Sequence, residues 1–247
     1  MADTTTASKG SQRGPFLHVL LAVLGLAAFA GFVALGVWQM ERRVWKLELI
    51  DAVNQRATAA AVSAPGMPDW AQVSRDRDEY RHVSASGEFL SEGDIRVATA
   101  SELGTGYWIM TPLRRADGSL VFINRGFVEQ GQAPTPVPAG QVEVAGLLRM
   151  GEPGGGVLRD NQPGAGRWYS RDVVAMASQY GLAPVAPYFI DAQANAPGSP
   201  GGTGPVGGLT VITFHNNHLV YALTWFALAA LVVIAAWIVW REPAGKR

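Results

Sequence analysis

The fold of this chain is decided by residues 215–225, HNNHLVYALTW, which lead into an apolar run that ends at Trp240. Residues 192–240 contain no charged side chain. A helix from His218 to Trp240 has the roughly 20 apolar residues that a bilayer crossing requires. An ionisable side chain at the edge of a membrane is a functional hypothesis by default. The stretch therefore predicts a membrane helix with a polar site at its first turn.

A second uncharged segment, residues 14–40, predicts another membrane helix over residues 16–38. The alternative is a cleaved signal peptide, because Ala28-Phe29-Ala30 fits the small-residue cleavage pattern behind a basic start. The apolar run continues well beyond that site, to Trp38, and this favours an uncleaved anchor.

The charge distribution predicts the orientation of these helices. The chain has 20 basic and 20 acidic residues, so no global field draws it to nucleic acid. Lys and Arg outnumber Asp and Glu in both terminal segments, whereas the middle has a small acidic excess. By the positive-inside rule, both termini lie in the cytoplasm and the middle lies on the outer side of the bilayer.

These signals divide the chain into segments. We expect a disordered cytoplasmic tail at 1–15, a transmembrane helix at 16–40, a juxtamembrane amphipathic helix at 41–64, a periplasmic β-rich domain at 65–216, a second transmembrane helix at 217–240 and a cytoplasmic tail at 241–247. Residues 195–208 form a Gly/Pro linker. The expected fold class is an α+β membrane protein, with two antiparallel transmembrane helices flanking an extracytoplasmic antiparallel β-rich domain that carries one or two helices.

Apolar runs between turn residues predict the strands of the outer domain. A hairpin is expected at Asp117-Gly118, because Asp-Gly between two such runs favours a tight turn. A helix is expected at 171–180, capped by Ser170, with Asp172 in its first turn and Gly181 at its end. Strands are expected at 80–90, 95–99, 107–113, 120–128, 142–148 and 188–191, with 209–214 returning to the sheet.

Several kinds of chemistry are excluded. The chain has no cysteine, which rules out disulfides, thiolate catalysis and cysteine-based metal sites. The common motifs of metalloproteases, phosphate-binding loops and serine hydrolases are missing, and no nucleophile with a neighbouring base can be defended. The four histidines, His18, His82, His215 and His218, are too scattered for a metal triad. We therefore expect a protein that is not an enzyme.

One helical face at the start of the second membrane segment could carry a cofactor. His218, Tyr221, Ala222 and Trp225 fall at i, i+3, i+4 and i+7, which brings an imidazole, a phenol and an indole to one side. Such a face suits haem, with His218 as the axial ligand of the iron and aromatic rings to stack on the macrocycle. The alternative is that the aromatic rings pack on the partner helix and His218 lies in the headgroup layer. His215 precedes the apolar run and is expected to be a bystander.

The antiparallel arrangement places the outer end of the first helix level with His218. Trp38, Gln39, Arg42, Arg43 and Trp45 belong to this end. Arg42 and Arg43 could pair with haem propionates through charge-assisted hydrogen bonds. Alternatively, they could extend to lipid phosphates.

Five blocks of sequence, in this order between the two anchors, resemble the Surfeit locus protein 1 family. They are Gly36-Val37-Trp38-Gln39, Gly106-Tyr107-Trp108-Ile109-Met110-Thr111-Pro112, Asn124-Arg125-Gly126-Phe127-Val128, Trp168-Tyr169 with Arg171-Asp172, and Asn216-Asn217-His218-Leu219. We expect Gly106 and Gly126 to serve backbone turns where a side chain would clash and Pro112 to end a strand. Arg125 is expected either to order a loop or to face a partner.

The resemblance implies a function in the biogenesis of haem–copper terminal oxidases such as cytochrome c oxidase. A bacterial member of this family would lie in the inner (plasma) membrane and bind haem a transiently through His218. Tyr221, Trp225, Trp38, Arg42 and Arg43 would contribute to the cofactor site. The implied partners are the haem a synthase, oxidase subunit I and the lipid bilayer, with no nucleic acid. The alternative is a scaffold that stabilises oxidase subunits through its periplasmic domain without binding haem.

Overall fold

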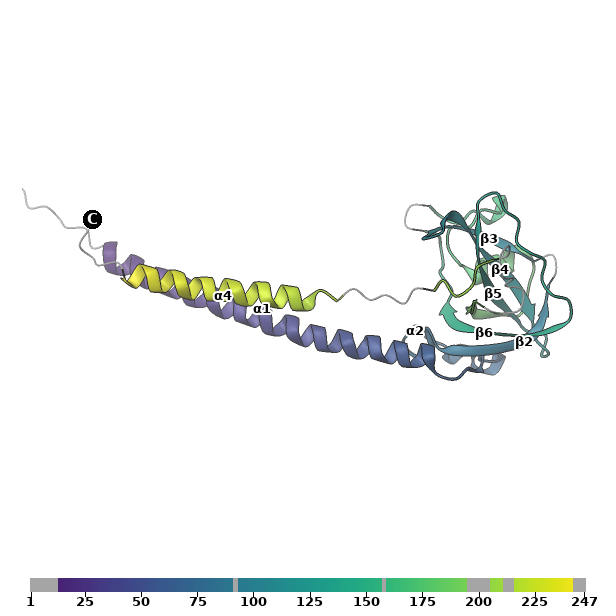
Figure 1. Cartoon of the computed structure of the whole chain (residues 1–247), viewed down its shortest axis with the longest axis horizontal. Coiled ribbons are helices and arrows are strands. Elements are labelled where there is room, and N and C mark those ends of the chain that lie inside the picture. The colour runs from purple at the N-terminus through teal and green to yellow at the C-terminus, as the bar shows by residue number, and fades with distance from the viewer. Residues whose placement is uncertain (1–12, 91–92, 157–158, 195–204, 211–215, 242–247) are drawn as a thin grey trace, which may run out of the picture. The chain divides into compact units, whose positions relative to one another are not determined.

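The computed structural model describes residues 13–90, 93–156, 159–194, 205–210 and 216–241 (Figure 1). The chain forms two compact units. The helical unit comprises the chain up to Ile50 together with Phe214–Arg247, and the β unit comprises Asp51–Thr213. The expected terminal tails fall almost wholly outside the described residues, as does most of the expected 195–208 linker.

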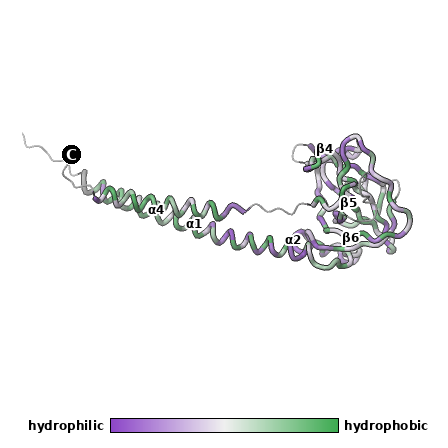
Figure 2. Tube along the Cα trace, in the orientation of Figure 1, coloured by the Kyte–Doolittle hydropathy of each residue, from purple (hydrophilic) through white to green (hydrophobic). Residues whose placement is uncertain are grey.

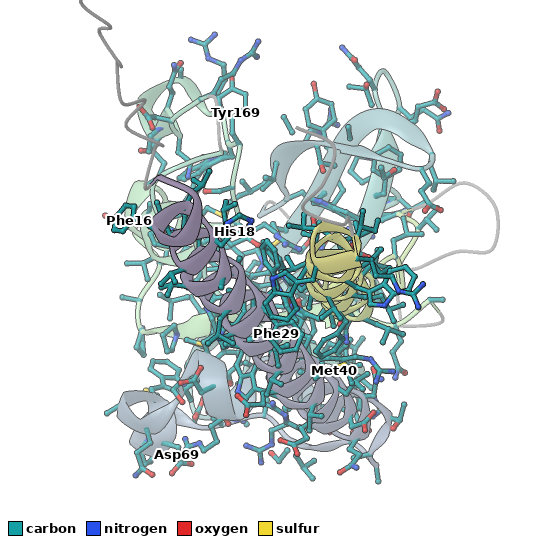
Figure 3. All side chains as sticks on the ribbon, turned by 90° about the vertical axis from the view of Figure 1, so that its left-hand side faces the viewer. Phe16, His18, Phe29, Met40, Asp69 and Tyr169 are labelled. Atoms are coloured by element: carbon teal, nitrogen blue, oxygen red, sulfur yellow. The ribbon has the colours of Figure 1, made fainter. Side chains whose placement is uncertain are left out.

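The helical unit is built from α1 (Arg13–Thr58) and α4 (His218–Arg241). Apolar residues cover α4 and the N-terminal part of α1 on all sides, and polar residues appear toward the C-terminal end of α1 (Figure 2). Side chains such as Phe16 project outward from α1 (Figure 3), and Phe16 is 73% exposed. Helices that are apolar on every side and largely exposed need a lipid environment. Both helices are long and apolar enough to cross a bilayer, which indicates a membrane protein.

The two helices pack antiparallel, as predicted. The rings of Phe32 and Trp225 stack with their centroids 5.8 Å apart. Gly36 lies under the ring of Phe226, so that a Cβ atom at residue 36 would come within 2.5 Å of it. Ala222 and Ala229 of α4 are buried in the same interface. Small residues therefore let the two backbones approach closely, as is common between membrane helices.

The β unit is a closed five-stranded barrel with small additions. Its strands follow the order β1-β2-β6-β7-β5-β4-β3, and a further pairing of β2 with β4 closes the ring of β2, β6, β7, β5 and β4. The elements are β1 (Val62–Ser63), η1 (Met67–Gln72), α2 (Arg75–Asp78), β2 (His82–Phe89), β3 (Ile95–Ser101), β4 (Gly104–Arg114), β5 (Leu120–Glu129), β6 (Gln141–Met150), η2 (Pro163–Ala165), α3 (Val173–Gln179) and β7 (Val185–Ala192).

The predicted β-rich domain is confirmed, and two of its pairings differ from the antiparallel expectation. β5 pairs with β7 in parallel, and the short β1 pairs with β2 in parallel. Parallel neighbours require a long connection, and here the chain reaches β7 only after β6, η2 and α3. The remaining ladders are antiparallel.

Both faces of the central strands are buried. Val121 and Ile123 point into the barrel core, whereas Phe122 between them points into a second cluster beneath α3. Ile190 and Phe189 of β7 divide between the two clusters in the same way. Successive side chains of a strand point to opposite faces, so a strand covered on both sides reads as a continuous apolar run.

Two local predictions are wrong in detail, and a third is confirmed. The N-cap of α3 is Asp172, whose carboxylate accepts from Ala175 N at 3.1 Å, and not Ser170. Pro112 lies inside β4, opposite Phe122, and does not end it. Gly181, with φ of +62°, ends α3 as expected.

Gly106 and Gly126 lie inside β4 and β5 and not in turns, whereas the clash expected for a side chain at these positions is confirmed. At both positions a Cβ atom would overlap backbone atoms of another segment, so each glycine permits a close approach. Of the expected returning strand at 209–214, residues 209–210 are not in a strand and the others fall outside the described residues.

Candidate functional site

His218 at the first turn of α4 faces α1. Its Nδ1 lies 2.7 Å from Oε1 of Gln39. An amide oxygen can only accept a hydrogen bond, so Nδ1 is the donor in this contact, and in the neutral imidazole the lone pair is then on Nε2. A histidine that ligates a metal commonly donates its other N–H to an oxygen in this way, which fixes the tautomer and the ring orientation. The Gln39 contact thus engages Nδ1 and fixes the orientation of the His218 ring.

The aromatic residues of the predicted cofactor face separate in the structure. Trp225 packs between the helices, where it stacks on Phe32. Tyr221 is 55% exposed, while its neighbour Ala222 is fully buried. The face turned toward α1 therefore contains His218, Ala222 and Trp225, and the Tyr221 ring lies on the outer side of α4.

Of the predicted residues of α1, Trp38 directly precedes Gln39, and Arg42 and Arg43 follow it by about one helical turn. The Trp38 ring is 53% exposed. The guanidinium carbon of Arg42 lies 3.9 Å from the centre of the Trp45 ring, a cation–π contact that keeps this charge at the helix surface. Arg43 is partly exposed. His218, Gln39 and the Arg42–Arg43 pair therefore belong to one end of the helical unit, and His215 falls outside the described residues.

Among the described residues, no three His, Asp or Glu side chains come together as ligands for a metal ion. A single histidine can be enough to hold haem, since haem supplies four equatorial nitrogens itself and needs one imidazole from the protein.

A buried ionic network crosses the β unit, and sequence reasoning missed it. Asp191 of β7 accepts from Arg149 Nη1 at 3.0 Å and from Arg171 Nη1 at 3.4 Å. Arg149 also contacts Glu79 at 2.8 Å, and Arg171 contacts Glu152 at 2.6 Å. Burial alone would lower the pKa of Arg149, but the nearby carboxylates raise it by more. The pKa therefore lies above its ordinary value, and the guanidinium is held charged. A carboxylate within the apolar run of β7 was the available signal, because a buried acid is almost always paired.

A strap of chain, residues 205–210, covers this network. Val206 and Phe127 exchange two backbone hydrogen bonds of 2.8 and 3.0 Å. Gly208 N donates to Ala192 O at 3.0 Å, and the Thr210 hydroxyl donates to Asp191 Oδ2 at 2.9 Å. Gly126 makes the approach possible, since its φ of +126° and missing Cβ leave room for the strap. The strap thus ties the end of the β unit to its buried charges.

Arg125 orders a loop, which decides between the two roles expected for it. Its side chain is buried, with Nη1 3.3 Å from Asp94 Oδ2 and Nη2 donating to Thr135 O at 2.6 Å. A side chain that is 1% exposed cannot face a partner protein. Its contacts instead hold the segment after β5 against the segment before β3.

Comparison with known proteins gives consistent results along the chain. The family model described as the SURF1 family matches residues 26–230. A SURF1-like protein of Monosiga brevicollis is 34% identical, over 100% of this chain and 96% of its own length. Surfeit locus protein 1 of Rattus norvegicus is 31% identical, over 91% of this chain and 76% of its own. Surfeit locus protein 1 of Homo sapiens is 33% identical, over 93% of this chain and 79% of its own.

Proposed function

This chain belongs to the SURF1 family, whose members are known as non-enzymatic assembly factors of cytochrome c oxidase, and we propose that it binds haem a and presents it to oxidase subunit I. The haem a synthase would supply the cofactor. The protein would lie in a bacterial inner membrane, with both termini in the cytoplasm and the β unit in the periplasm.

The hydrogen bond between His218 and Gln39 carries this proposal. It engages Nδ1 as the donor, so that Nε2 of the neutral imidazole would be the nitrogen that donates a lone pair to iron. His218 would thus hold the haem iron through Nε2. The remaining work falls to side chains that bind and orient.

The other side chains of the proposed site bind the periphery of the ligand. Tyr221 and Trp38 offer exposed aromatic rings, and Trp225 supports α4 through its stacking on Phe32. Arg42 and Arg43 would bind the propionate groups through charge-assisted hydrogen bonds. A single neutral imidazole and surface arginines make a weak site, which suits a protein that must release its ligand.

The test is a visible spectrum of the full chain purified in detergent from cells that make haem a. We expect a reduced spectrum with a haem a band, lost in His218→Ala and weakened in Gln39→Leu. His18→Ala is the matched control, because it removes a histidine near the other end of α1 (Figure 3) and should leave the band unchanged.

The competing function is a scaffold that supports oxidase subunits through the β unit without haem. A wild-type protein with no haem band, together with full oxidase assembly by His218→Ala, would favour the scaffold and reject the haem proposal. Both measurements are needed, because a lost band alone does not show that haem binding matters for assembly.

A further inference from the structure

Two cavities of the β unit lie on either side of Arg77 and Arg81. The smaller has a volume of about 320 Å³, and Ala59, Ala60 and Val62 form its apolar lining, here called its floor. Arg56 and His82 also line it. The larger has a volume of about 490 Å³ and includes Arg115. Arg77 and Arg81 line both cavities, so the two form one groove with a shared arginine wall.

The groove carries an excess of positive charge. Three guanidinium groups and no carboxylate line the smaller cavity. In the larger one, Asp78 is fully buried and already paired with Arg77 at 3.1 Å and Arg81 at 3.0 Å. Asp69 is the other acid of that lining. Four arginines thus face two carboxylates, one of which is withdrawn from solvent.

Backbone carbonyls hold two of these arginines in place. Arg56 Nη1 donates to Asp76 O at 2.8 Å, and Arg115 donates to Pro65 O at 2.9 Å and to Ala64 O at 3.2 Å. A carbonyl oxygen orients a guanidinium but does not neutralise it. These charges are therefore fixed in position and still available to an anion.

We propose that this groove binds an extended acidic segment of a partner protein. Its carboxylates would pair with Arg56, Arg77 and Arg81, and a small apolar side chain would cover the floor of the smaller cavity. An extended peptide presents every second side chain to the same surface, which suits adjacent apolar and charged compartments. A lipid headgroup would place only one anion here. The groove lies wholly within the β unit and does not depend on haem at His218.

The test uses the full chain in nanodiscs of zwitterionic lipid and a fluorescent decapeptide containing four Glu and two Leu. We expect binding by fluorescence polarisation at low salt, weakened at least tenfold when Gln replaces Glu in the peptide. Arg56→Gln should weaken binding about fivefold, as expected for one partly exposed ion pair. Arg75→Gln is the matched control, since its side chain is 64% exposed on α2 and lines neither cavity.

Three results would overturn the proposal. The first is that no peptide binds at millimolar concentration. The second is that Arg75→Gln and Arg56→Gln reduce the affinity for the peptide equally, which would indicate only general electrostatic attraction. The third is that Arg56→Gln weakens binding to phosphatidylglycerol vesicles but not to the peptide, which would assign the groove to lipid.

A second variant covers the case in which Arg56→Gln fails to fold. Val62→Asp places a carboxylate on the floor at an exposed position and should abolish peptide binding; unchanged binding would contradict the proposal. The haem band of both variants should remain that of the wild type, which separates this proposal from the function of His218.

Discussion

Replacing Gly126 by alanine should detach the strap, residues 205–210, from the barrel. The added Cβ would overlap the carbonyl group of Val206. The atoms that the Cβ would meet belong to the backbone of the strap, so no side chain can rotate to make room. The strap must move, or β5 must distort around a residue with φ of +126°.

The magnitude follows from the contacts that hold the strap. Val206 and Phe127 share two backbone hydrogen bonds, Gly208 contributes one and Thr210 contributes one to Asp191. At about 1 kcal/mol net for each bond, detachment forfeits about 3–4 kcal/mol of local stability. Gly118→Ala is the matched control, because Gly118 also has a positive φ, of +81°, but no atom lies within 4 Å of the added Cβ. It incurs the backbone strain alone, about 1–2 kcal/mol.

Hydrogen–deuterium exchange of the full chain in detergent measures the effect directly. In Gly126→Ala, the amides of Val206 and Gly208 should exchange about 100-fold faster, which corresponds to about 3 kcal/mol of lost protection. In Gly118→Ala the same amides should keep their wild-type rates. Equal protection of the strap in the two variants would refute the steric reasoning.

Gly36→Leu should weaken the α1–α4 pair in detergent by about 1–3 kcal/mol, because its side chain would collide with Phe226. At Gly31 no atom lies within 4 Å of an added Cβ, so Gly31→Leu should leave the unfolding of the helix pair unchanged. Burial alone would raise the pKa of Asp78 and Glu152, but hydrogen bonds and nearby arginines lower it by more. In the folded protein both pKa values therefore lie below the ordinary 3.8 and 4.5. Their stabilisation is full above the ordinary values and is lost as pH falls through the folded ones, so the melting temperature should drop below about pH 4.5 and depend less on pH in Asp78→Asn. Burial raises the pKa of Tyr188 to about 12, so its absorbance change should appear at about pH 12 and earlier only if the barrel opens.

Periodicity was sufficient to predict the helices and most strands, because apolar spacing reports which face of an element is covered. The antiparallel arrangement placed Gln39 level with His218, and the 2.7 Å hydrogen bond between the two side chains confirms this. Periodicity could not decide which neighbouring residue of α4 faces α1. Tyr221 and Ala222 are one residue apart, about 100° around the helix. Only packing, such as that of Trp225 on Phe32, selects Ala222 and Trp225 for the interface.

Contacts distant in sequence lay beyond prediction. The closing contact of the barrel is a short pairing, Glu88 with Arg114 and Phe89 with Leu113, which leaves no periodic signal. Arg125 looked like an exposed loop charge and proved to be a buried one. The buried network around Asp191 draws its members from segments far apart in the chain, so their spacing carried no information about the pairing. The haem contacts of His218 and its neighbours stay a prediction until the spectra are measured.

Closure of the barrel also limits how the β unit can recognise another chain. A partner cannot extend the sheet by adding a strand to β5, β6 or β7, since both edges of each already pair with neighbours. Among the described residues, the outermost strands offer little more: β1 has two residues, and Ala98 of β3 already donates to Trp168 O at 2.8 Å. Strand addition through backbone hydrogen bonds, which does not depend on the partner's sequence, therefore has little place to occur. Discrimination between partners must come from side chains.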